Sequence, residues 1–535
     1  VASALDCLPE FVGVHLALDG DGAGGVVGLD GVHTVQLADG VLDVLFTAAT
    51  GHPLDAEVCW CHTAALTAAG QHGYGLATTP HANPSRYVTC SQSVAVTTPI
   101  HERPADLLSE LIQFETVNPP GDERACIEYI DGLLTEAGLE TETLAAEDER
   151  PNLLARLPGG DEAPLLMQGH VDVVPVEGQE WEEPPFSGVQ KDGFVWGRGA
   201  LDMKGGVAMM VSAMLRAAAE GVEPAGDVLL LVLSDEETGG DVGAKYLVEN
   251  HPERFEGVKY AIGEFGGFPL RIDGTEFYPI QVAEKRVCWL EATVTGRGGH
   301  ASRPQRDGAM HAVGQLLTRL TENRLPVHIT PAAREFVEAL AAEAEPERAA
   351  QLRGLLDPEW TDEILDELGP ITERLDPMLH NTVSPTVVDG GGKVNVHPAE
   401  IDLRLDARLL PGVTPEAFLE EVWEVVGDVE GVEFEVTRFD GGEGGGVDMG
   451  QFDLLSDALT EHHSDAVPVP FLLTGATDGR FFEQLGIQSY GFTPLLLPET
   501  FEFESLVHAA NERVPVESVA FGADTLSTVI REYES

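Results

Sequence analysis

Two segments of this chain consist almost entirely of apolar residues, and they constrain its fold more than any other feature. Residues 164–171 and 228–234 show almost no alternation of apolar and polar side chains, which is typical of strands buried on both faces. A further strand is predicted at 258–263. Amphipathic helices are predicted before and between these strands, at 105–116, 123–137, 205–220 and 241–250. This order predicts an α/β domain built on a sheet flanked by helices.

Carboxylate and imidazole side chains stand where these strands end. Ligands of α/β sheets bind at the carboxyl ends of strands. Solvated surface acids are the simpler explanation for any single residue, but four acids at successive strand ends favour a site for two divalent cations that share a ligand. The residues are His170 and Asp172 after the first strand, Asp235, Glu236 and Glu237 after the second, Glu264 after the third, Asp202 in a glycine-rich segment, and His508.

Five blocks, in order, resemble the co-catalytic zinc family of aminoacylases, glutamate carboxypeptidases, acetylornithine deacetylases and succinyl-diaminopimelate desuccinylases. The resemblance spans residues 104–535 and implies a zinc-exopeptidase-like catalytic domain with a mixed sheet. The blocks are Gly-His-Val-Asp at 169–172, Gly-Arg-Gly-Ala-Leu-Asp-Met-Lys-Gly at 197–205, Asp-Glu-Glu-Thr-Gly-Gly at 235–240, Gly-Arg-Gly-Gly-His-Ala-Ser-Arg-Pro at 296–304, and His-Ala-Ala-Asn-Glu-Arg-Val at 508–514.

The resemblance implies a role for each matching residue in a site for two divalent cations, Zn²⁺ first and Co²⁺ or Mn²⁺ as alternatives. Asp172 is expected to orient a ligand imidazole, and Glu236 to act as general base for a hydroxide that bridges the metals. The ligand set carried over is Asp202 bridging both cations, His170 and Glu264 completing one site, and Glu237 and His508 completing the other. Asp202 is also expected to precede a strained or cis peptide bond.

A small α+β sandwich is predicted within residues 286–440, between catalytic segments 101–285 and 441–535. Residues 331–368 form an acidic helical insertion in it. The resemblance implies that this domain is a lid and dimerisation domain of a homodimer. His300, otherwise a loop histidine, would then stabilise the oxyanion in the other subunit's site.

Three further positions match blocks that face the substrate in the family. Arg408 is expected to clamp a substrate carboxylate, with a salt bridge to Asp406 as the less favoured alternative. Asn395 and Gly475 match the other substrate-side blocks.

The expected reaction is hydrolysis of the amide bond of N-acyl amino acids or short peptides with a free carboxylate. The biosynthetic members usually carry Gly-Glu-Pro-Thr where this chain has Gly-Glu-Phe-Gly-Gly at 263–267, which favours an aminoacylase or carboxypeptidase. A succinyl-diaminopimelate desuccinylase or acetylornithine deacetylase is the alternative. A non-catalytic metal-binding scaffold is the alternative of another class.

Residues 1–100 differ in composition from the rest of the chain. They hold one basic and nine acidic residues and show no sustained helical or strand period, so we expect an extension that is weakly ordered or an over-long start-site assignment. The glycines at 20–25 match a dinucleotide-binding pattern, but no helix that could bind a pyrophosphate follows. Cys59, Cys61 and His62 lack a fourth ligand for structural zinc.

The formal charge of -60 excludes nucleic acids and anionic membranes as partners, because both would repel this surface. No apolar run approaches the roughly 18 residues of a membrane helix, and no secretory signal is evident, which favours the cytoplasm. Six of the 31 basic residues are lysines. Such a lysine-poor, carboxylate-rich chain is typical of a halophilic cytoplasm.

We predict that the protein requires salt. At molar salt the Debye length is roughly 3 Å, so the repulsion among carboxylates is screened and the compact state is favoured. Circular dichroism and amidase activity measured from molar to zero salt should show loss of both in dilute buffer. A protein that stays folded and active without salt would contradict this prediction.

Overall fold

The computed structural model describes residues 98–441 and 447–534 in full, and before them only the backbone of four strands. These strands, β1 (Thr34–Ala38), β2 (Val41–Thr47), β3 (Val58–Thr63) and β4 (Leu76–Ala77), form an antiparallel sheet. Contacts divide the chain into two units, Val1–Thr97 and Thr98–Ser535. The glycine pattern at 20–25 and the side chains of residues 59–62 lie outside the described residues, so the interpretation of residues 1–100 stays a prediction.

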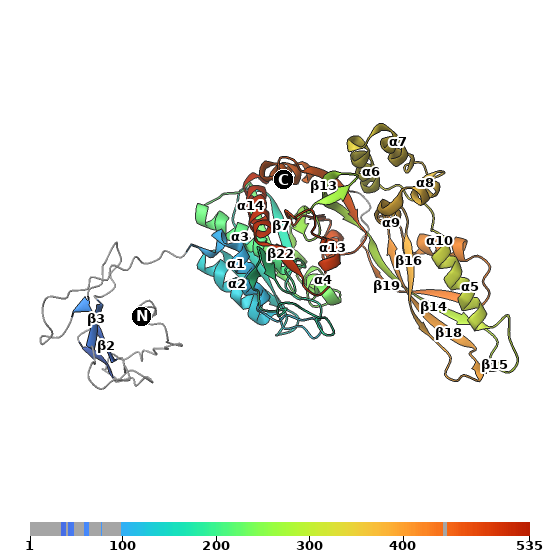
Figure 1. Ribbon diagram of the computed structural model, residues 1–535, viewed down its shortest axis with the longest axis horizontal. Helices are drawn as coiled ribbons and strands as arrows, with labels where there is room; N and C mark the ends of the chain where they lie inside the picture. Colours follow the sequence, from blue (N-terminus) through green and yellow to red (C-terminus); the bar gives the residue numbers. More distant parts are fainter. Residues whose placement is uncertain are drawn as a thin grey trace. The chain divides into compact units, whose positions relative to one another are not determined.

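In the described part of the second unit, nine strands form a mixed sheet, as predicted (Figure 1). The strand order is β12-β13-β21-β11-β7-β10-β6-β5, and β20 pairs with β13. β7 pairs in parallel with β10 and β11, whereas β6 pairs antiparallel with β10. The strands are β5 (Glu140–Ala145), β6 (Pro151–Leu157), β7 (Glu162–His170), β10 (Gly226–Leu233), β11 (Tyr260–Gly263), β12 (Leu270–Ile272), β13 (Thr275–Glu284), β20 (Val467–Leu473) and β21 (Gln488–Gly491).

Helices cover both faces of this sheet because its central strands are apolar on both faces. In β10, Val228, Leu230 and Val232 belong to one core, and the leucines between them belong to another. The first core includes α1 (Pro104–Ile112), α2 (Arg124–Glu136), α3 (Lys204–Glu220), α11 (Phe452–His462) and α14 (Val516–Glu532). The second core includes α4 (Ala244–Asn250) and α12 (Gly479–Phe482). No helix in the described ranges is long and apolar enough to cross a membrane.

A smaller antiparallel sheet of order β16-β18-β14-β19 packs against two helices, which gives the α+β sandwich predicted within 286–440. Its elements are β14 (Arg286–Thr295), β16 (Thr382–Asp389), β18 (Glu400–Leu409), β19 (Val432–Asp440), α5 (Ala309–Glu322) and α10 (Pro415–Val426). A two-stranded sheet of β15 (Gly299–His300) and β17 (Val396–His397) lies at its end (Figure 1). The role of this domain as a lid and dimerisation domain stays a prediction.

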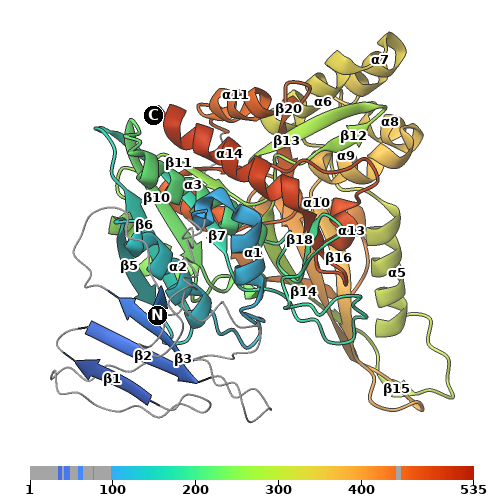
Figure 2. The ribbon, with the colours of Figure 1, turned by 60° about the vertical axis from the view of Figure 1, so that its left-hand side comes forward.

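The helical segment within this stretch differs from the expectation that placed 331–368 in the small sandwich. It contains α6 (Pro331–Glu343), α7 (Pro346–Gly354), α8 (Thr361–Glu367) and α9 (Thr372–Leu379). Its apolar residues share the core of the large sheet, and Figure 2 shows it beside β12, β13 and β20. Phe336 of α6 packs edge-on against Phe471 of β20, with ring centroids 5.4 Å apart. The apolar face of α6 therefore finds its partner on the catalytic sheet.

We predict that Phe336→Ala lowers the free energy of unfolding by about 3–5 kcal/mol, because it leaves a cavity between α6 and β20. Denaturant unfolding in high salt measures this change. Trp360→Ala is the control, since Trp360 is 52% exposed, and it should change the free energy by less than about 0.5 kcal/mol. Equal effects of the two substitutions would contradict the packing described here.

Candidate metal centre

Adjacent parallel strands bring the predicted residues to one edge of the large sheet. β11, β7 and β10 are neighbours, so their carboxyl ends coincide. His170 is the last residue of β7, Glu264 follows β11, and residues 235–237 follow β10. Asp235 adopts a positive φ of 72°, and its carboxylate accepts a hydrogen bond from the backbone N–H of Val242. The carboxylate of Asp235 therefore stabilises the short turn that follows β10.

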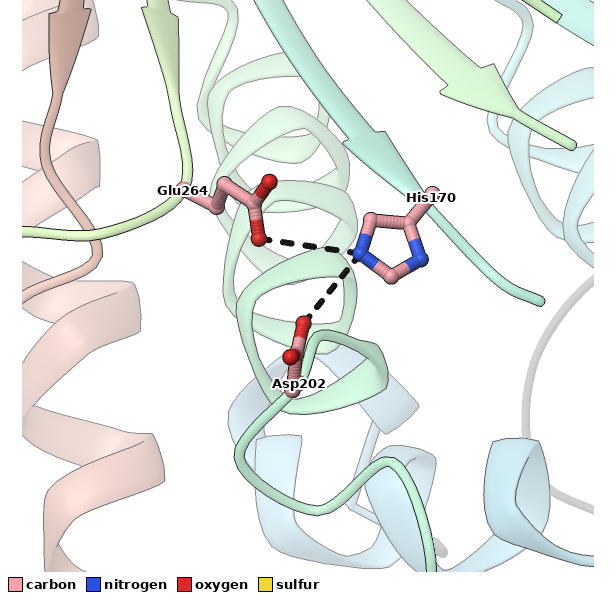
Figure 3. A group of neighbouring side chains, drawn as sticks. All are labelled: His170, Asp202 and Glu264. Atoms are coloured by element: carbon pink, nitrogen blue, oxygen red, sulfur yellow. Dashed lines mark hydrogen bonds and ion pairs between the residues drawn. The ribbon is translucent and has the colours of Figure 1, made fainter. Parts of the chain in front are cut away.

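One group of potential ligands consists of His170, Asp202 and Glu264 (Figure 3). His170 Nε2 lies 3.2 Å from Asp202 Oδ1 and 3.6 Å from Glu264 Oε2. Figure 3 shows the carboxylates of Asp202 and Glu264 directed at the same ring nitrogen. His170 and Glu264 are buried, so this group presents one imidazole and two carboxylates to a shielded point.

A second group consists of Asp202, Glu237 and His508. His508 Nε2 lies 3.1 Å from Asp202 Oδ2 and 3.2 Å from Glu237 Oε2. Within each group the potential ligand atoms lie within 4.8 Å of one another. Asp202 thus directs one oxygen to each group, which is the arrangement that a bridging carboxylate requires.

Asp202 is positioned by Glu512, a residue that the sequence analysis did not assign. Glu512 Oε1 accepts hydrogen bonds from the backbone N–H groups of Leu201, at 2.8 Å, and Asp202, at 3.2 Å. Its other oxygen forms a buried ion pair with Arg198 at 2.6 Å. The Asp202–Met203 peptide bond is cis, which confirms the expectation.

A short sheet joins the segment before Asp202 to the segment that follows Glu512, although the two are far apart in the sequence. β9 (Phe194–Trp196) pairs antiparallel with β22 (Arg513–Pro515), and β8 (Gln190–Lys191) flanks β9. Glu512 lies in the quoted block 508–514, so its place in the block was visible, but its contact with Asp202 appears only in the fold.

Asp172 contacts residues of both groups of potential ligands. Its carboxylate oxygens accept the backbone N–H groups of Glu236 and Glu237, each at 3.1 Å. Oδ1 also lies 3.4 Å from His170 Nδ1, and Oδ2 accepts a hydrogen bond from Asn118 at 2.8 Å. His170 Nδ1 also lies 3.0 Å from the carbonyl oxygen of Asp172. Asp172 therefore holds the imidazole through its backbone carbonyl, and its fully buried carboxylate holds the turn that carries both glutamates.

Burial and the clustered charges shift the pKa values of these groups. Burial alone would lower the pKa of His170, but its hydrogen bonds to Asp172, Asp202 and Glu264 outweigh burial and raise the pKa well above its ordinary value. Hydrogen bonds to Asp202 and Glu237 raise the pKa of His508 to about 10. Burial, followed by repulsion from Glu264, raises the pKa of Glu236. The site therefore attracts positive charge strongly.

Glu236 lies beside the two groups and is not a member of either. Its Oε1 is 3.7 Å from the Nη1 of Arg480, a buried arginine on α12. A cavity of about 830 Å³ is lined by Asp202, Glu236, Glu237, Glu264 and His508 among others. Gly475, one of the predicted substrate residues, also lines this cavity.

The remaining predicted residues lie on the smaller sandwich and are not brought into either group. His300 is exposed on β15, and Asn395 is exposed beside it, with its carbonyl accepting the N–H of Ala301. Arg408 pairs with Asp406 through two hydrogen bonds of 2.7 and 3.1 Å, which is the arrangement that the sequence analysis regarded as less favoured. Substrate contacts by these three residues stay predictions.

Comparison with known proteins identifies a matching family. The model described as "Peptidase family M20/M25/M40" matches residues 166–532. The chain is 27% identical to a probable carboxypeptidase S-like 2 of Dictyostelium discoideum, over 66% of this chain and 69% of that protein. It is 27% identical to the N-fatty-acyl-amino acid synthase/hydrolase PM20D1 of Xenopus tropicalis, over 66% of this chain and 70% of that protein. It is 28% identical to a succinyl-diaminopimelate desuccinylase of Alkalilimnicola ehrlichii, over 79% of this chain and 96% of that protein.

The fold has a counterpart among solved structures. The M20 family metallo-carboxypeptidase Sso-CP2 of Sulfolobus solfataricus superimposes with a TM-score of 0.58 at 16% identity. The match covers 80% of this chain and 98% of that protein. At this identity the likeness establishes the fold, including the mixed sheet and its flanking helices.

We predict that Glu512→Gln weakens metal binding about 10- to 100-fold, because it breaks the ion pair with Arg198 and loosens the backbone at Asp202. Titration with a chromogenic chelator measures the affinity, and circular dichroism verifies folding. Glu517→Gln is the matched control, because Glu517 is an exposed acid in the first turn of α14, and it should leave the affinity unchanged. Unchanged affinity in Glu512→Gln would contradict the positioning role.

Proposed function

The chain belongs to peptidase family M20/M25/M40, and from this premise we propose that it is a dinuclear metal-dependent amidohydrolase. Its substrates are N-acyl amino acids or short peptides with a free carboxylate. The observation that carries the proposal is the sharing of Asp202 between two groups of potential ligands, with Glu236 beside both. Relatives named as a carboxypeptidase and as an N-fatty-acyl-amino acid hydrolase support this substrate class.

The donor set suits two divalent cations. His170, Asp202 and Glu264 would hold one cation, and Asp202, Glu237 and His508 would hold the other. Glu237 Oε1 is buried and has no hydrogen-bond partner among the described residues, as expected for an oxygen that serves a metal. The nitrogen and oxygen donors are compatible with Zn²⁺, Co²⁺ or Mn²⁺. When bound, two such cations polarise the amide carbonyl and lower the pKa of a water molecule.

The chain's own residues then carry the proton and fix the geometry. Glu236 accepts the proton of the attacking water at its carboxylate and returns it to the departing amine. The guanidinium of Arg480 restricts the carboxylate of Glu236 from one side. The carbonyl oxygen of Asp172 accepts the Nδ1 proton of His170, so that Nε2 faces the metal position.

We extend the proposal to the smaller sandwich on the basis of the family resemblance. His300 would reach the site of a second subunit in a homodimer and stabilise the oxyanion there, and Asn395 would contact the substrate. Arg408 would bind the substrate carboxylate in exchange for its present partner, Asp406. A homodimer, a salt requirement and a cytoplasmic location stay predictions.

Desuccinylation is the second candidate function. The relative named as a succinyl-diaminopimelate desuccinylase aligns over 96% of its own length. A panel of N-acetyl amino acids, dipeptides and N-succinyl-diaminopimelate, assayed in high salt, distinguishes the candidates. A strong preference for N-succinyl-diaminopimelate would replace our first assignment.

We predict that Glu236→Ala retains both cations and loses turnover by more than about 10²-fold, because the general base is removed and the ligands are kept. Metal content and amide hydrolysis are measured on the same sample. Glu223→Ala, an exposed acid after α3, is the control and should retain turnover. Unchanged turnover in Glu236→Ala would place the base elsewhere. If the parent protein hydrolysed no amide, the non-catalytic scaffold would be favoured.

A further inference from the structure

His508 is the most exposed of the potential ligands in the candidate metal centre. Its side chain is 51% exposed, whereas the other side chains of the two groups are at most 13% exposed. Its backbone adopts a φ of 61°, in the left-handed region that a residue other than glycine keeps only when its surroundings hold it there. The hydrogen bond from Gln179 Nε2 to its carbonyl oxygen, at 3.0 Å, is exposed. The position of His508 therefore depends on how the rest of its segment is held.

A cluster of three aromatic rings joins this segment to the segment that carries Glu264. Phe503, in α13 (Phe503–Leu506), stacks on Phe268, with ring centroids 4.3 Å apart and an angle of 19° between the ring planes. Phe265 meets both rings edge-on, with its centroid 6.2 Å from that of Phe503 and 6.0 Å from that of Phe268. Aromatic pairs of this kind stabilise a contact beyond the apolar area that they bury. The cluster therefore connects a segment of the first group of potential ligands with a segment of the second.

The three-ring cluster is anchored in the core on one side and borders the candidate metal centre on the other. Phe268 is 7% exposed and belongs to the core of the large sheet, against which Phe265 and Phe503 also pack. A narrow cavity of about 20 Å³ is lined by Phe265 and Phe503 together with Asp202 and Glu264. Through the ring of Phe503, the core therefore holds α13 close to two of the potential ligands.

The turn that contains Phe265 depends on the motif by which this chain departs from the biosynthetic members, Glu-Phe-Gly-Gly at 264–267 in place of Glu-Pro-Thr. Phe265 adopts a φ of 70°. A proline cannot adopt this conformation, because its ring fixes φ at about −65°. A Cβ at Gly266 would lie 2.1 Å from the carbonyl oxygen of Gly491, so only glycine fits there. The proline and the threonine of the other motif would therefore both disrupt the turn that brings Phe265 to Phe503.

We propose that Phe503 is a positioning residue for His508, and that the three-ring cluster determines how tightly the cation at His508 is bound. This role rests on the dinuclear centre of the proposed function. Without the ring of Phe503, α13 loses its contact with Phe268, and the cation itself must order His508. The free energy of that ordering then reduces the free energy of binding. The cation at His170 and Glu264 does not carry this cost, because both residues are buried.

Binding of Co²⁺ tests this role without depending on turnover. Metal-free protein is titrated with Co²⁺ in high salt, the absorption of the bound cobalt is followed through two equivalents, and circular dichroism verifies folding. In Phe503→Leu we expect the Kd of the weaker cation to rise about 10- to 100-fold and that of the tighter cation to stay unchanged. Phe503→Tyr keeps an aromatic ring in the cluster and should retain both Kd values of the parent protein.

Phe501→Leu is the matched control. Phe501 lies on the same segment as Phe503, is also partly buried and also stacks on a ring, that of Phe194, with centroids 6.1 Å apart. It does not contact the three-ring cluster through a ring pair, so its replacement should leave both Kd values unchanged.

Two further variants assign the effect to the cluster and to one ligand. Phe265→Gly suits the positive φ and removes a second ring, so it should weaken the same cation in the parent protein but add little in Phe503→Leu. In a His508→Ala background, Phe503→Leu should leave the Kd of the remaining cation unchanged, because the ligand that it positions is already absent.

The outcomes separate this role of Phe503 from the proposed function. Unchanged Co²⁺ binding in Phe503→Leu overturns the role, and so does equal weakening by Phe501→Leu, which would indicate a loosened segment instead of the cluster. Equal weakening of both cations overturns it as well. A parent protein that binds only one cation overturns the dinuclear centre and the role of Phe503 together. A parent protein that binds two cations but hydrolyses no amide overturns the proposed reaction alone, and the titrations still decide the role of Phe503.

Discussion

Repulsion among carboxylates is the constraint on which the rest of the site depends. Five carboxylates converge at one edge of the large sheet, where burial removes most of the water that would screen their charges. They belong to Asp172, Asp202, Glu236, Glu237 and Glu264. Burial raises the pKa of Glu237 and of Glu264, and neighbouring acids add to that rise. Such a cluster is tolerable only when positive charge is supplied, and the imidazoles at its centre are too few to supply it. Divalent cations relieve the repulsion most directly.

Backbone N–H groups and buried arginines also offset the negative charge of these carboxylates, and they fix the positions of the potential ligands. Asp172 accepts two N–H groups of the turn after β10, and Glu512 accepts two of the segment that carries Asp202. Arg150 pairs with Glu123 and Asp235 on the outer side of the turn, and Arg198 pairs with Glu512. The potential ligands are therefore positioned by Asp172 and Glu512, which are themselves charged. A change in either of these two residues is expected to displace the potential ligands.

The parts of the fold that sequence alone predicted are those whose signal is local. β7 and β10 were predicted because their apolar residues face two cores at once. β20 was missed because Val467–Leu473 contains two prolines, which disfavour central strands but suit a strand paired on one side only. The pairing of Arg408 with Asp406, and the contact of Glu512 with the Asp202 segment, depend on tertiary structure that no spacing reveals.

The helical segment at 331–379 shows how composition misleads about position. The sequence analysis placed its residues 331–368 in the small sandwich as an acidic helical insertion, yet a helix needs only one apolar face to pack on a sheet. Phe336 provides that contact on α6, and the packing carries Leu368 and Ile371 to the wall of the cavity. The strand ends then supply the chemistry, while an inserted segment that carries no ligand shapes the space beside them. Substitutions in that segment can therefore alter the shape of the cavity without disturbing the carboxylates of the candidate metal centre.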